Sequence, residues 1–124
     1  MESTIPEATP SEWIAQHAFL GRLLGRGLVQ WWQFAIRAME DALEVEGQVD
    51  RSLEMDLIAA VELVRHGGRR FFDACQQECF KGLSLERWKT WATRFGDVAA
   101  RMDEGTARGA ATWAGMQMLS MVEE

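Results

Sequence analysis

Two cysteines four residues apart, Cys75 and Cys79, have a spacing that could support a metal site. On a helix this spacing places both thiols on one face, where they could supply half of the ligands of a zinc ion. A closed zinc site needs two more ligands, and besides carboxylates the sequence offers only His17 and His66. We therefore expect both cysteines to be small, buried core residues with reduced thiols, because a disulfide at this spacing is geometrically awkward.

Glu62 and His66 also share a helical face, but they do not match a known catalytic pattern. A di-iron bundle uses Glu and His three residues apart on each of two helices, whereas here residue 65 is an arginine and no second copy exists. We interpret Glu62 and His66 as a solvated helical pair. None of the serines lies in a nucleophile elbow either. The sequence thus predicts a protein that is not an enzyme and that holds no metal and no cofactor.

The run from Arg65 to Arg70, RHGGRR, is a local basic patch. It fits either a site for an anion, a phosphorylated partner or an acidic helix, or a solvated face that balances nearby acidic residues. The whole chain carries 13 basic and 19 acidic side chains, for a net charge of −6. This balance argues against nucleic-acid binding and against electrostatic attraction to anionic lipids.

Long helices must position all of these residues. The first is expected to begin at Thr9, which forms a capping-box pattern with Glu12, and to continue to about Glu46. Gly47 marks a turn, and Asp50 is a candidate N-cap for the second helix.

The second helix is expected to end near Lys81, followed by Gly82, and Ser84 is expected to cap a third helix that reaches the end of the chain. With no alternating strand pattern, the fold class is all-α: a three-helix antiparallel bundle or a long helical hairpin of amphipathic helices. Residues 1–8 are expected to be a flexible tail, and residues 9–124 a single helical domain.

Glycines interrupt the first two helices. Gly21, Gly25 and Gly27 lower helix propensity, so a bend or fraying is expected there. The pair Gly67 and Gly68 would either kink the second helix or let another backbone approach closely.

Aromatic residues are the strongest functional signal, because the chain has 6 Trp, 6 Phe and 7 Met. Adjacent helical residues point about 100° apart, so Trp31 and Trp32 can flank one wide apolar face. These bulky side chains serve either a plain bundle core or an exposed surface that contacts something apolar. The residues predicted to make such contacts are Trp31, Trp32, Phe34, Trp88, Trp91 and Trp113.

Two segments carry a family resemblance: QWWQFAIRAMEDALE and FFDACQQECFKGLSLERWKTWATRFGDVAARM. In these segments, and in length and helical layout over roughly residues 30–121, the chain resembles the phasins, small bacterial proteins that coat polyhydroxyalkanoate storage granules. The resemblance implies an aromatic helix face that lies against the polymer, helices that associate between chains, and no catalytic residues. The segment KGLSLE lacks the proline that phasins usually have before the last helix, and the glycine content is high for a coating helix.

The leading hypothesis is therefore a non-enzymatic, cytoplasmic protein that forms homo-oligomers and coats a hydrophobic surface such as a storage granule. The first alternative is a helical adaptor or chaperone-like module that binds a protein partner. The second is an enzyme accessory subunit or a small cofactor-binding bundle. The sequence shows no secretory signal and no apolar stretch long enough to cross a membrane.

Overall fold

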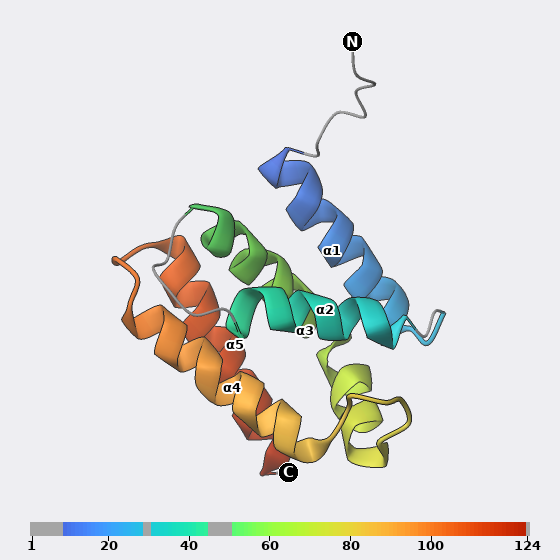
Figure 1. The fold of residues 1–124 in the computed structure, drawn as a ribbon. Helices are drawn as coiled ribbons and strands as arrows, with labels where there is room; N and C mark the ends of the chain where they lie inside the picture. The colour runs from blue at the N-terminus through green and yellow to red at the C-terminus, as the bar shows by residue number, and fades with distance from the viewer. Residues whose placement is uncertain (1–8, 29–30, 45–50, 124) are drawn as a thin grey trace.

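The computed structural model describes residues 9–28, 31–44 and 51–123, and within these ranges the chain is all-α, as predicted (Figure 1). No strand occurs in the described ranges. Their helices are α1 (Pro10–Gly25), α2 (Trp32–Leu43), α3 (Arg51–Gln77), α4 (Leu85–Ala100) and α5 (Thr106–Val122). The predictions for the tail over residues 1–8, for a turn at Gly47 and for a cap at Asp50 fall outside the described residues.

Two of the predicted helix starts are confirmed by their capping hydrogen bonds. The Thr9 side chain accepts from the backbone N–H of Glu12 at 3.1 Å, and the Glu12 carboxylate accepts from the backbone N–H of Thr9 at 3.1 Å. The Ser84 hydroxyl likewise accepts from the backbone N–H of Arg87 at 3.0 Å. These bonds satisfy N–H groups that have no partner inside the helix, which is why both helices begin there.

The number of helices differs from the prediction, because two of the three expected helices are each divided. The expected first helix ends at Gly25, and Gly27, with φ of +70°, lets the chain reverse before α2 begins. The expected third helix is interrupted between Ala100 and Thr106, and its two parts form the hairpin of α4 and α5. The expected second helix ends at Gln77 rather than at Lys81.

The central helix is α3, which contacts each of the other four helices (Figure 1). Contacts between α1 and α3 advance together along both helices, from Gly21 beside Leu63 to Gly25 beside Gly67, so α1 and α3 are parallel. The intervening α2 runs in the opposite sense, with Trp32 beside Phe71. The chain therefore alternates in direction, and the predicted antiparallel bundle is built from five shorter helices within the described residues.

Glycines make the contact between α1 and α3 unusually close. A Cβ atom on Gly67 would lie 2.8 Å from the carbonyl oxygen of Gly21, and a Cβ atom on Gly25 would collide with the carbonyl oxygen of His66. The prediction that another backbone approaches α3 near Gly67 is thus confirmed. Backbone-to-backbone packing of this kind has no room for a side chain.

An aromatic core lies where α2, α3 and α4 meet. The Trp32 ring stacks on Phe71 with a centroid distance of 6.1 Å, and Phe71 meets Trp88 edge-on at 5.6 Å and Trp91 at 5.7 Å. All four side chains are buried. We call these four residues the aromatic core; such ring pairs stabilise the fold beyond the area that they bury.

None of the helices in the described ranges has the length and apolar character needed to cross a membrane.

Candidate functional site

Three of the six predicted contact residues are buried, so the prediction that they form an exposed surface is wrong for Trp32, Trp88 and Trp91. Their exposed fractions are 9%, 0% and 0%. Packing alone does not explain this burial, because an indole N–H also needs an acceptor. Trp88 donates from Nε1 to the carbonyl oxygen of Met118 at 2.9 Å, and Trp91 donates from Nε1 to the Glu44 carboxylate at 2.6 Å.

The other three predicted residues reach the surface to different degrees. Trp31 is 54% exposed, although its neighbour in the sequence belongs to the aromatic core. Phe34 and Trp113 are half-buried. The Arg65 guanidinium covers the Trp113 ring at 4.6 Å from its centroid, which is a cation–π contact. The predicted contact set therefore does not form one continuous face.

Trp31 and Phe34 lie beside a concave surface that we call the aromatic groove. It consists of three adjoining depressions of about 470, 470 and 500 Å³, all lined by Phe80. The groove is also lined by Trp31, Trp32, Phe34, Arg37, Arg70 and Lys81.

Two turns place the aromatic side chains of the groove. Trp31 is the N-cap residue of α2, just before the helix that carries Trp32 into the core. Because α3 ends at Gln77, Phe80 lies in the loop before α4 and is 39% exposed. Gly82, with φ of +101°, turns that loop back toward α4. Sequence reasoning missed Phe80 because it assigned this residue to a helix, although the glycine two residues later was a signal for a loop.

A polar cluster fixes one wall of the groove. The Arg87 guanidinium donates to Glu40 at 2.7 Å, to Glu44 at 3.1 Å and to the carbonyl oxygen of Gly82 at 3.1 Å, and it lies 4.9 Å from the Trp91 ring centroid. Burial opposes ionisation of Glu44, but the hydrogen bonds from Trp91 and Arg87 outweigh it and lower the pKa of Glu44. This cluster ties α2 to the start of α4 and to the loop that carries Phe80.

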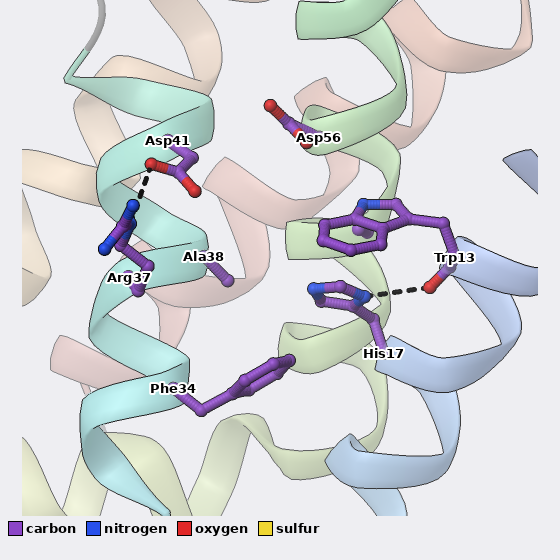
Figure 2. Close-up of a pocket in the computed structure, with 8 residues that line it drawn as sticks. Trp13, His17, Phe34, Arg37, Ala38, Asp41 and Asp56 are labelled. Carbon is purple, nitrogen blue, oxygen red and sulfur yellow. Dashed lines mark hydrogen bonds and ion pairs between the residues drawn. The ribbon is translucent and has the colours of Figure 1, made fainter. Parts of the chain in front are cut away.

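A second, smaller cavity lies between α1, α2 and α3 (Figure 2). Its volume is about 50 Å³, and Figure 2 shows His17 between Trp13 and Phe34, with Asp56 on α3 beyond the indole. The His17 ring lies 4.6 Å from the Trp13 ring and 5.0 Å from the Phe34 ring. His17 is only 3% exposed.

The hydrogen bonding of His17 defines its tautomer. Nδ1 lies 2.8 Å from the carbonyl oxygen of Trp13, and because a carbonyl only accepts, Nδ1 carries the hydrogen. Burial lowers the pKa of His17 more than that hydrogen bond and the charge of Asp56 raise it, so the ring is neutral at pH 7. The Trp13 Nε1 is buried without a hydrogen-bond partner in the described part of the chain. A cavity of this size and polarity suits a few water molecules rather than a substrate.

The cysteine pair does not form a site. Cys75 is buried, and desolvation raises its pKa to about 12, so its thiol is unreactive at neutral pH. Cys79 is exposed, which corrects the expectation that both thiols are in the core; the reason is that α3 ends before it. Within the described residues, no three His, Cys, Asp or Glu side chains are grouped to hold a metal ion.

Most of the other polar candidates along α3 contact neighbouring side chains or helices. Glu62 forms an ion pair with Arg65 at 2.9 Å, not with His66, which is half-buried against Gly21 of α1. In the predicted basic patch, the guanidinium of Arg69 lies 6.0 Å from the Phe72 ring centroid. Arg70 is exposed and lines the aromatic groove, so the patch and the groove adjoin.

Comparison with known families gives one match. The sequence model of a family described as "Protein of unknown function (DUF3632)" matches residues 1–95, which include α1, α2, α3 and most of α4. All residues that line the aromatic groove lie within this match. Neither the curated proteins nor the solved structures gave a match to this chain.

Proposed function

We propose that this chain, which belongs to the DUF3632 family of proteins of unknown function, is a non-enzymatic binding module that holds an apolar segment of a protein partner in its aromatic groove. The observation that carries the proposal is the exposure of Trp31 and Phe80 beside depressions large enough to take side chains. Exposed aromatic residues at the edge of a concave surface are typical anchors of protein interfaces.

Three side chains that could take part in catalysis are buried, ion-paired or enclosed, and this supports a binding role. The Cys75 thiol is buried with a raised pKa, Glu62 is ion-paired with Arg65, and His17 is enclosed beside a cavity of about 50 Å³. The larger depressions adjoin aromatic and basic side chains instead. Binding there would be driven by apolar area, at about 25 cal/mol per Å² removed from water.

A second candidate function is the phasin-like one, in which the chain coats a hydrophobic surface such as a storage granule in the cytoplasm and self-associates there. The observation that favours it is that several exposed apolar side chains lie outside the groove: Phe19 on α1, Leu28 in the turn after α1, and Met116 and Leu119 on α5. An extended apolar surface would contact these residues as well, whereas a single bound peptide segment would not.

Binding of a hydrophobic dye to the folded protein tests the proposed groove. We expect wild-type protein to enhance the emission of the dye, and we expect Trp31→Ala and Phe80→Ala to remove most of this enhancement. Leu119→Ala is the matched control, because Leu119 is 43% exposed but lies on α5 and lines none of the three depressions. Equal dye binding by wild type and both groove variants would disprove the groove as the binding site.

Co-sedimentation with polyester particles separates the two candidate functions. A coating protein would sediment with the particles and would lose this property through Phe19→Ala or Met116→Ala as much as through Trp31→Ala. A groove that binds a peptide segment predicts no sedimentation that depends on Phe19 or Met116.

A further inference from the structure

The charges of this acidic chain are distributed unevenly. Residues 19–37 contain three arginines and no acidic residue, and residues 66–82 contain three basic and two acidic residues. These two segments together have a formal charge of +4. The rest of the chain therefore carries −10, which gives the net charge of −6. A segregation of this size creates a positive field over one region of an otherwise negative protein.

The two basic segments meet at the end of the bundle that carries the groove. A Cβ atom on Gly27 would lie 3.1 Å from the Arg70 guanidinium, and a Cβ atom on Gly82 would lie 3.2 Å from the Ile36 side chain. The Trp32 ring stacks on Phe71, which joins the start of α2 to the second half of α3. Of the charged residues in these two segments, Arg37, Arg70, Lys81 and Asp73 line the groove, three cations against one carboxylate.

Apart from Arg87, which is engaged with Glu40 and Glu44, the cations that line the groove are available to a partner. Arg70 and Lys81 are exposed, and neither forms an ion pair with another residue in the described part of the chain. Arg37 reaches Asp41 at 3.3 Å, but its side chain is 76% exposed, so this pair is weak. Two acidic residues also line the depressions: Glu40, which shares the Arg87 guanidinium with Glu44, and Asp73.

The occupant must satisfy its own backbone hydrogen bonds. A peptide in extended conformation binds well when it can pair with the edge of a sheet, and the described residues contain no strand. The groove offers mainly side chains, and a helix is the conformation in which a peptide pairs its backbone internally. An amphipathic helix would place apolar side chains from successive turns into the adjoining depressions.

A lipid surface fits the groove less well than a helix does. The apolar side chains Trp31, Phe34 and Phe80 adjoin depressions of about 470 Å³ or more, and a flat bilayer surface leaves such depressions unfilled. Side chains of a helix can enter them.

From these observations we propose that the partner segment is an acidic amphipathic helix, whose apolar face contacts Trp31 and Phe80 and whose carboxylates face Arg37, Arg70 and Lys81. The proposal rests on the proposed function of the groove and adds the chemistry of its partner. The apolar contacts supply affinity, and the charges select acidic partners over basic ones.

Two labelled peptides test this proposal by fluorescence anisotropy with the full chain. Each is about 18 residues long, enough to become helical, with leucines at helical spacing on one face. The polar face carries glutamates in one peptide and lysines in the other. We expect the glutamate peptide to bind at least about tenfold more tightly than the lysine peptide, and the difference to shrink when salt is raised from about 0.05 to about 0.5 M.

Variants locate the bound peptide. Trp31→Ala should weaken binding of the glutamate peptide by at least about tenfold, as expected for an aromatic anchor. Arg70→Glu and Lys81→Glu should each weaken it by about threefold or more. The matched control is Lys89→Glu, which makes the same change of charge at an exposed residue of α4 that lines none of the three depressions. Circular dichroism establishes that every variant is folded.

Each contrary outcome has a separate meaning. If both peptides bind equally and Trp31→Ala weakens both, the charge inference is overturned while the proposed function stands. If neither peptide binds, the inference is also overturned, and equal dye binding by wild type, Trp31→Ala and Phe80→Ala would then remove the proposed function as well. If no peptide binds, two other results would overturn the helix proposal. Binding to vesicles of equal phosphatidylcholine and phosphatidylserine that is lost in Lys81→Glu would make a lipid surface the occupant of the groove. Self-association that is lost in Lys81→Glu would make a second copy of the chain the occupant.

Discussion

Trp31 and Trp32 are neighbours in the sequence, but Trp31 belongs to the aromatic groove alone, whereas Trp32 belongs to the aromatic core and only its edge lines the groove. Trp32 is 9% exposed and stacks on Phe71, whereas Trp31 is 54% exposed at the N-cap of α2. Both regions contain Trp and Phe side chains. What separates them is the number of elements that surround each side chain: α2, α3 and α4 enclose the core, while the groove lies where α2 begins and the loop before α4 passes.

Removal of an aromatic side chain should therefore affect the two regions very differently, and this is the largest expected effect. Trp88→Ala removes ring contacts with Phe71 and Phe72 and the hydrogen bond to the Met118 carbonyl oxygen, so we expect a loss of about 3–5 kcal/mol in the free energy of unfolding. Trp31→Ala should cost less than about 1 kcal/mol, because half of its surface is already in water. Urea denaturation of both variants measures the contrast, and similar losses would contradict it.

The close backbone contact between α1 and α3 can be tested at a single residue, with a smaller expected effect on stability. Gly25→Ala places a Cβ against the His66 carbonyl oxygen, which forces the backbones apart, and we expect it to cost about 1–3 kcal/mol. Gly109→Ala is the matched control, because a Cβ there meets nothing within 4 Å, and it should stabilise α5 by up to about 1 kcal/mol. In thermal denaturation, Gly25→Ala should have a lower Tm than wild type and Gly109→Ala a higher one. Equal shifts in the two variants would show that α1 and α3 can separate freely.

Protonation of His17 should have a still smaller effect on stability. His17 lies on α1, where its ring contacts Phe34 of α2. The pKa of His17 is lowered below 6.5 on folding, chiefly by burial, so the unfolded chain binds the proton more readily than the folded chain. Stability should therefore fall as pH decreases below about 6.5, before carboxylates such as Glu44 titrate.

Tm measured between pH 7.5 and pH 5 tests this expectation about His17. His17→Gln removes the titrating group and should flatten the dependence of Tm on pH over that range. An unchanged dependence in His17→Gln would assign the effect to other groups.

The sequence predicted the helical class and the capped helix starts because these depend on local chemistry. Thr9 with Glu12, and Ser84, form the hydrogen bonds that their positions indicated. The close approach at Gly67 was also predictable, since the absence of a side chain is visible in the sequence.

The sequence did not predict the two reversals or the division of the tryptophans between core and surface. Apolar periodicity continues through residues 28–43, so the break before Trp32 depends on Gly27 and on the packing of α2 across α3. The burial of Trp88 and Trp91 depends on acceptors far away in the sequence, Met118 and Glu44, which no local pattern reveals. The groove depends in the same way on a loop that brings Phe80 beside α2.

The indole N–H signals in an ¹⁵N-correlated NMR spectrum test the central claim most directly, because the 6 tryptophans report separately on the core and on the groove. Single Trp→Phe variants assign the signals of Trp31, Trp88 and Trp91. On titration with the glutamate peptide, the account predicts that the Trp31 signal shifts progressively to saturation while the signals of Trp88 and Trp91 stay in place. A saturating shift at Trp88 or Trp91 with an unmoved Trp31 signal would contradict it.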